Sequence, residues 1–157
     1  MPRKNSRDSR IVRTLIEHQP WSKGWSFIPI EDMSHSQTIQ TLQDSLIFLS
    51  FGYPEGFGLP VAEALACGCA VIGYSGLGGR ELFNIPNHNY FTSHVEYGDW
   101  KGFVDGVMNA VHAIHNSPST HIACALKISA YVRETYGDHS FRNSIKVALS
   151  SLYRLEN

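Results

Sequence analysis

The sequence predicts an α/β fold in which a Rossmann-like parallel sheet is flanked by helices and followed by a helical C-terminal tail. Two observations carry this prediction. Leu46–Leu49 and Ala70–Tyr74 are short, continuous apolar runs, and such runs are typical of parallel strands buried on both faces. Segments with apolar residues at helical spacing lie between and around these runs. Strands that alternate with helices form parallel sheets with right-handed crossovers.

The first thirty residues predict a helix and a strand. Asn5 or Ser6 is placed to cap the helix, because both side chains can accept hydrogen bonds from the free amides of a first turn. Pro20 and Gly24 end this helix. Trp25–Ile30 is then predicted to form a short strand, rich in aromatic and β-branched residues.

Three helical segments follow. Ser34 and Gln37 have the spacing of a capping box, which predicts the start of a second helix. A third helix is predicted from Pro60, a residue suited to a first helical position, to Gly68. Arg80–Phe83 is predicted to begin a short helix after the second apolar run.

The C-terminal part, residues 99–157, is predicted to be helical. Before it, Asn89–Thr92 is predicted as a last edge strand. Ser119 or Thr120 is expected to cap the second helix of this tail, which stops near Gly137. The apolar stripe of a final helix comprises Phe141, Ile145, Ala148, Leu149, Leu152 and Leu155.

Composition narrows the class of protein. At 157 residues the chain is predicted to be one domain, spanning 1–157. A net charge of −1 gives no general attraction to nucleic acid or membranes, and no apolar run approaches the roughly 18 residues of a spanning helix. Three cysteines and no apolar signal segment favour a cytoplasmic location with reduced thiols. Basic residues cluster near the N-terminus: Arg3, Lys4, Arg7, Arg10 and Arg13. Two interpretations of this cluster remain, the solvated face of a helix and a phosphate-binding role.

The stretch between Glu55 and Glu63 is the strongest functional signal. Gly56 and Gly58 allow close approach of the backbone to a ligand and torsion angles closed to other residues. Pro60 starts a helix, and Glu63 is expected in its first turn. A helix N-terminus at the carboxyl end of a strand binds anions. Two carboxylates beside it favour a ligand with both hydroxyl and phosphate groups, such as a sugar nucleotide.

This stretch resembles a hallmark of GT-B glycosyltransferases, in the large retaining family called group 1 or GT4-like. The hallmark is a Glu, seven residues and a second Glu, and here it reads Glu55-Gly-Phe-Gly-Leu-Pro-Val-Ala-Glu63-Ala. The Gly78-Gly79-Arg80-Glu81 stretch is similar to the second glycine loop of the family. The resemblance implies the donor-binding, second half of a GT-B fold. That half normally begins with a strand, and we expect this sequence to lack it.

The resemblance also implies roles for individual residues. Glu55 is the catalytic candidate, contacting the donor sugar and stabilising positive charge at the anomeric carbon. Glu63 would accept hydrogen bonds from the ribose hydroxyls. The further donor-binding candidates are Gly56, Phe57, Gly58, Leu59, Gly78, Gly79, Arg80, Arg3 and Lys4. Phe57 is expected to pack rather than to stack on a base, and a surface ion pair is the alternative for Arg80.

The implied reaction transfers a hexose from a UDP-, GDP- or ADP-linked donor to a hydroxyl acceptor, with retention, no cofactor and no metal. Cys67, Cys69, His112 and His115 do not have the spacing of a zinc site. Since the N-terminal acceptor domain is not present in these residues, the isolated chain is expected to be inactive and to associate with that domain or with itself. A non-catalytic nucleotide-binding or assembly module, paired with a separately encoded acceptor domain, is the alternative.

Overall fold

The computed structural model describes residues 5–85, 90–137 and 140. At its centre is a parallel sheet of three strands, β1 (Ile47–Ser50), β2 (Ala70–Gly73) and β3 (Thr92–His94). The strands lie in the order β1-β2-β3, with Phe48 opposite Val71 and Ile72 opposite Ser93. This confirms the predicted α/β class with a Rossmann-like parallel sheet.

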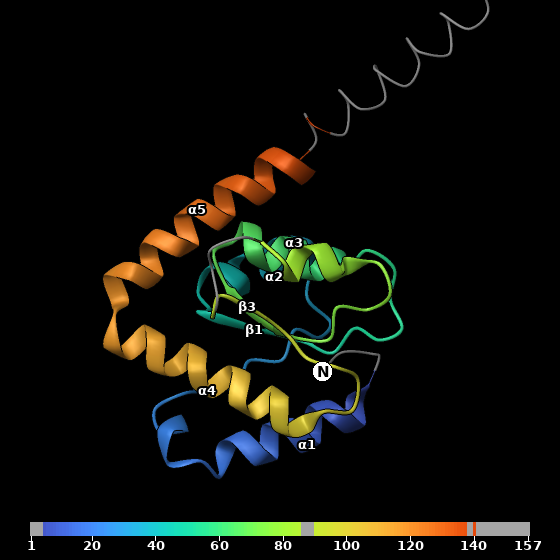
Figure 1. The fold of residues 1–157 in the computed structure, drawn as a ribbon. Helices are drawn as coiled ribbons and strands as arrows, with labels where there is room; N and C mark the ends of the chain where they lie inside the picture. Colours follow the sequence, from blue (N-terminus) through green and yellow to red (C-terminus); the bar gives the residue numbers. More distant parts are fainter. Residues whose placement is uncertain (1–4, 86–89, 138–139, 141–157) are drawn as a thin grey trace, which may run out of the picture.

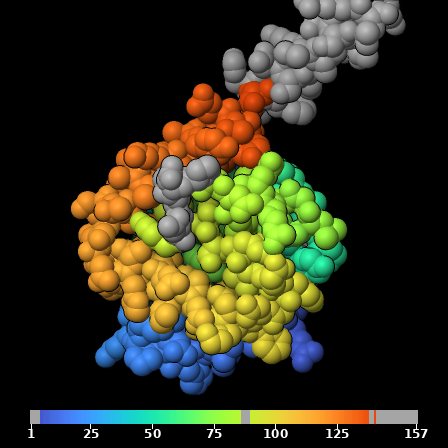
Figure 2. Space-filling view, in the orientation of Figure 1, coloured from blue at the N-terminus to red at the C-terminus, as the bar shows by residue number. Residues whose placement is uncertain are grey.

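Helices cover both faces of the sheet (Figure 1). On one face lie α1 (Ser6–Glu17) and α4 (Trp100–Asn116), and on the other lie α2 (His35–Gln43) and α3 (Leu59–Ala66). The long helix α5 (Pro118–Tyr136) packs against both α3 and α4. In Figure 2, α4 and α5 cover much of the visible face of the molecule. Two short 3-10 helices complete the fold, η1 (Pro20–Ser22) and η2 (Gly79–Phe83).

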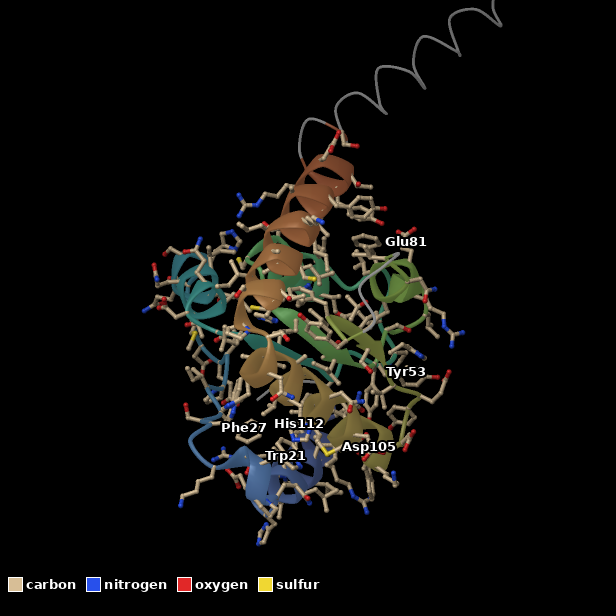
Figure 3. The ribbon with its side chains drawn as sticks, turned by 60° about the vertical axis from the view of Figure 1, so that its left-hand side comes forward. Trp21, Phe27, Tyr53, Glu81, Asp105 and His112 are labelled. Carbon is tan, nitrogen blue, oxygen red and sulfur yellow. The ribbon has the colours of Figure 1, made fainter. Side chains whose placement is uncertain are left out.

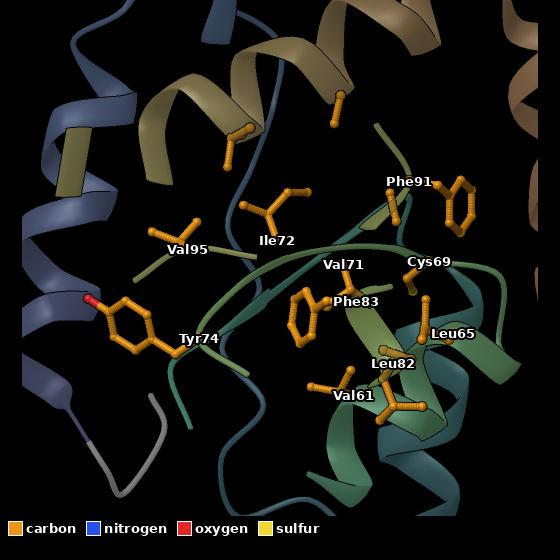
Figure 4. Close-up of a cluster of buried hydrophobic side chains, with 14 of the residues drawn as sticks. Val61, Leu65, Cys69, Val71, Ile72, Tyr74, Leu82, Phe83, Phe91 and Val95 are labelled. Atoms are coloured by element: carbon orange, nitrogen blue, oxygen red, sulfur yellow. The ribbon is translucent and has the colours of Figure 1, made fainter. Parts of the chain in front are cut away.

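The core lies on both sides of β2, whose four residues are all buried. Val71 and Ile72 point to opposite faces, as successive strand residues must, and Ile72 faces α4 (Figure 4). There α4 approaches so closely that a side chain on Gly106 would lie 3.0 Å from Ile72. Cys69 is fully buried, and its thiol lies 3.1 Å from the carbonyl oxygen of Leu42. Burial raises the pKa of Cys69 to about 12, so this thiol stays protonated.

Local signals predicted several helix boundaries well. The capping box is present as expected, because Gln37 donates its amide to the Ser34 hydroxyl and accepts from the Ser34 amide. The prediction for Asn5 was wrong in its mechanism, since Asn5 precedes α1 but makes no side-chain cap. The α5 cap was also misplaced. The helix begins at Pro118 instead of after Ser119 or Thr120, because proline suits the first turn. Its end at Gly137 is confirmed.

The sheet differs from the prediction at its edges. Trp25–Ile30 is extended but forms no strand, because none of the strands in the described residues lies in position to pair with it and Pro29 has no amide to donate. Residues 47–49 of β1 are half-buried and not fully buried, since β1 is an edge strand. The last strand begins at Thr92, so the predicted segment overlaps it by one residue. The predicted final helix, from Phe141, lies outside the described residues.

We expect the stability of this fold to fall as the pH drops below 6.5, partly through His121. This residue is 3% exposed, its ring lies beside those of Tyr90 and Phe91, and its Nδ1 has no hydrogen-bond partner among the described residues. Burial lowers the pKa of His121 from its ordinary value of 6.5. Below that pH the unfolded chain therefore takes up a proton that the native state resists, which favours unfolding.

Urea unfolding across this pH range, on the wild type and on His121→Phe, measures the effect. The variant should lose less stability on acidification. Burial also lowers the pKa of His94, so some pH dependence should remain in the variant. Identical pH slopes in the two proteins would contradict the assignment to His121.

Candidate functional site

The loop between β1 and α3 forms one side of the candidate site. Gly58 adopts a left-handed conformation, with φ of 81°, and its carbonyl oxygen accepts from the amides of Val61 and Ala62. The helix therefore begins at Leu59, one residue before Pro60. Glu63 is the fifth residue of α3 and lies in its second turn, so its expected place in the first turn was wrong by one turn.

Four consecutive backbone amides in this loop are available to a ligand. Gly56, Phe57, Gly58 and Leu59 donate no hydrogen bond within the part of the chain that the structure describes. They lie at the N-terminus of α3 and at the carboxyl end of β1, where ligands bind in open α/β sheets. A side chain added at Gly56 would meet nothing within 4 Å, so the backbone there is open to solvent. The arrangement suits an anion or a ring of hydroxyl groups.

The second glycine loop lies directly against the first. Leu77 donates its amide to the carbonyl oxygen of Glu55 at 2.7 Å, and Gly78 donates to that of Gly56 at 3.0 Å. A side chain added at Gly79 would collide with the carbonyl oxygen of Phe57. The absence of side chains at Gly78 and Gly79 thus permits the two loops to meet. A bulky residue at Gly79 would separate them, so it is unsuitable as a simple test of ligand contact.

Both motif carboxylates line one groove of about 450 Å³, which runs between β1, α1 and α3. The Glu55 carboxylate folds back over Gly52, where any added side chain would collide with it. Glu55 and Glu63 are each partly exposed. The structure therefore brings together the two glutamates that sequence reasoning placed on either side of a helix start.

Among the described residues, one basic side chain lines the same groove. Arg13 of α1 lines it, and its guanidinium lies over the ring of Phe27 at 5.5 Å and pairs with Glu17 at 2.7 Å. Sequence analysis grouped Arg13 with the other basic residues and did not distinguish it. No sequence signal distinguished it, because the groove is formed by residues of α1, β1 and α3 that lie far apart in the sequence.

The remaining cations lie elsewhere or beyond the described part. Arg7 and Arg10 line a separate shallow surface pocket on α1. Arg80 forms an exposed ion pair with Glu96 at 2.8 Å, which is the alternative that the sequence left open for it. Arg3 and Lys4 lie outside the described residues.

The aromatic ring of the first glycine loop packs against α5. The Phe57 ring lies 5.2 Å from that of Tyr136, which confirms the expected packing role and ties the loop to α5. Figure 3 shows the side chains of the described residues, with Tyr53 and Glu81 among those labelled. Within residues 5–85, 90–137 and 140, no group of three or more His, Cys, Asp or Glu side chains could hold a metal ion.

Comparisons with known proteins agree with this geometry. The family model described as glycosyl transferases group 1 matches residues 26–116, more than half of the chain. An α-1,6-glucosyltransferase of Actinobacillus pleuropneumoniae serotype 7 (strain AP76) is 34% identical over 77 residues, which are 49% of this chain and 21% of that protein. The chain therefore matches about a fifth of the length of this relative. No solved structure matches the chain.

None of the helices in the described residues is long and apolar enough to cross a membrane. The matched family segment spans β1, the glycine loop, α3, β2 and α4, which together carry the free amides and both carboxylates. The chain belongs to the group 1 glycosyltransferase family, and it is a glycosyltransferase domain with a Rossmann-like fold.

Proposed function

We propose that this domain binds the nucleotide-diphosphate sugar donor of a hexosyltransferase. The observation that carries the proposal is the set of four free amides, Gly56 to Leu59, beside two carboxylates that line one groove. Amides at a helix N-terminus suit the negative charge of a phosphate or the oxygen atoms of a sugar. Carboxylates suit hydroxyl groups, which are donors. A sugar nucleotide presents both kinds of group.

Each carboxylate has a separate task in this proposal. Glu63 accepts hydrogen bonds from the two ribose hydroxyls, and Glu55 contacts the hexose and stabilises the positive charge that develops at its anomeric carbon. The Gly78-Gly79 loop lies beside the diphosphate, with Arg3, Lys4 and Arg80 as candidate cations for the departing nucleoside diphosphate. For Arg80 this requires release from Glu96. The transfer proceeds with retention and without a metal.

The isolated chain is proposed to bind donor but not to catalyse transfer. The acceptor and the second wall of the cleft would come from an N-terminal domain outside these residues. Without them, neither orientation of the acceptor nor exclusion of water is provided. An assembly module is the second candidate, and the exposed edge of β1 is the observation that favours it.

We expect Glu63→Gln to weaken nucleotide binding by about 1.5–3 kcal/mol, because a hydrogen bond to a charged group is lost. Calorimetric titration of wild type and variant with UDP, GDP and ADP measures this loss for the base that binds best. Glu134→Gln, an exposed residue of α5, makes the same charge change away from the groove and serves as the control. Equal affinities in Glu63→Gln and wild type would show that Glu63 does not recognise ribose.

A further inference from the structure

One carboxylate oxygen lies between two basic side chains just beyond the carboxyl end of β3. Glu96 Oε1 accepts a hydrogen bond from a guanidinium nitrogen of Arg80 at 2.8 Å, and the same oxygen lies 3.7 Å from Nδ1 of His94. The second distance is slightly too long for a hydrogen bond. Arg80 therefore holds this oxygen, and His94 would compete for it once its ring carries a proton.

The two basic side chains differ in how firmly they are held. The side chains of Arg80 and Glu96 are 62% and 74% exposed, so their ion pair adds little to stability and exchanges easily for another partner. The His94 side chain is only 21% exposed, and its ring meets the buried ring of Phe83 edge to face at 5.9 Å. Protonation of His94 would therefore move the side chains of Glu96 and Arg80 and leave the imidazole in place.

Arg80 begins beside the donor loop, which we define as residues 56–59, whose four amides donate to no described residue. Gly79, its neighbour in η2, lies so close to this loop that an added side chain would collide with the carbonyl oxygen of Phe57. The side chain of arginine is long, has several rotatable bonds and binds phosphate through two parallel hydrogen bonds. Once free of Glu96, Arg80 can add a positive charge to the amides of the donor loop.

The charges around His94 give the direction of its response. Burial lowers the pKa of His94 from its ordinary value of 6.5, whereas the Glu96 carboxylate raises this pKa and the Arg80 guanidinium lowers it. Glu81, also in η2, lies beside Tyr136 of α5, and β2 places a glycine opposite His94. Withdrawal of Arg80 therefore raises the pKa of His94, and by linkage the protonation of His94 favours the withdrawal of Arg80.

We propose that Glu96 is a positioning residue that holds Arg80 away from the donor loop, and that protonated His94 binds the Glu96 carboxylate and releases Arg80 to a diphosphate. The inference rests on the proposed donor site. Binding of a diphosphate draws Arg80 away from Glu96, so it is accompanied by uptake of a proton from solvent at His94. The affinity for diphosphate should accordingly increase as the pH falls through the pKa of His94.

NMR of the 157-residue chain without any ligand tests the release of Arg80. The ring nitrogens of His94 and the guanidinium nitrogens of Arg80 are followed from about pH 8 to about pH 5, a range that spans the titration of histidine. The Arg80 signals should shift with the same midpoint as the His94 ring in the wild type and stay constant in His94→Gln. The pKa of His94 should rise in Arg80→Gln and fall in Glu96→Gln. Arg80 signals that do not follow His94 would overturn the proposal.

Calorimetric titration with inorganic diphosphate tests the consequence for binding. At about pH 8, Glu96→Gln should bind diphosphate about two- to fivefold more tightly than the wild type, because an exposed carboxylate no longer competes for Arg80. At about pH 5 the two affinities should be equal, since protonated His94 occupies Glu96 in the wild type. Comparison at one pH cancels the protonation of the ligand. Glu134→Gln, an exposed residue of α5, makes the same charge change and should match the wild type.

The outcomes separate this inference from the proposed donor site. Equal affinities in Glu96→Gln and the wild type at both pH values would overturn the inference and leave the donor site in place. A gain in Glu96→Gln of the same size at both pH values would also overturn it, because His94 would then have no part. If no protein binds diphosphate but the Arg80 signals follow His94, the donor site fails and the release of Arg80 by His94 stands.

Discussion

Gly73→Ala is expected to lower the free energy of unfolding by about 3–5 kcal/mol, among the largest effects of any single substitution. Gly73 ends β2 with φ of 136°, a conformation that residues with a side chain rarely adopt. An added Cβ would collide with the carbonyl oxygen of Ser50 and lie 2.8 Å from the ring of Phe103. That oxygen accepts from the amide of Tyr74 at 2.9 Å, so the collision breaks the pairing of β1 with β2.

Chemical denaturation of wild type and variant measures this loss. Gly24→Ala is the matched control, because Gly24 also has positive φ, at 90°, but an added side chain there meets nothing within 4 Å. The free energy of unfolding of the control should fall only by the cost of holding an alanine at positive φ, about 1–2 kcal/mol. Equal losses at both positions would show that the contact with Ser50 is not important.

Phe103→Ala is expected to cost about 3–5 kcal/mol, the usual range for a buried aromatic side chain. Phe103 of α4 is fully buried. Its ring stacks on Phe51 with centroids 4.7 Å apart and meets Tyr74 edge to face at 5.6 Å. The substitution leaves a cavity between α4 and the ends of β1 and β2, next to the candidate site.

Thermal and chemical unfolding should both detect the change. Phe103→Leu keeps part of the volume and should lose less. Leu126→Ala on α5 removes a similar apolar side chain that is 68% exposed, and it should change stability by less than about 0.5 kcal/mol. A loss in Phe103→Ala no greater than in Leu126→Ala would contradict the packing role of this ring.

The buried contact between Tyr74 and α1 shows what sequence reasoning could not supply. The Tyr74 hydroxyl donates to the Asp8 carboxylate at 2.9 Å across 66 residues of chain. Burial and this hydrogen bond raise the pKa of Tyr74, so its hydroxyl stays protonated. Sequence analysis assigned Tyr74 to a strand and Asp8 to a helix, but the pairing depends on how the helix crosses the sheet. Likewise, the pairing of Arg80 with Glu96 became evident only from their position in the fold.

The sequence by itself determined the features that depend on neighbouring residues. The capping box at Ser34 and Gln37 is satisfied within four residues, and apolar runs predicted β1 and β2 to within one residue. The glycines and glutamates between Glu55 and Glu63 led to the hypothesis of a donor site, which stays a prediction. Only the tertiary structure decided whether Trp25–Ile30 is a strand, because a strand exists through hydrogen bonds to a neighbour and the described part of the chain places none there. The exposed edge of β1 and the position of Arg13 in the groove of the two glutamates also depend on contacts between distant segments of the chain, so only the tertiary structure shows them.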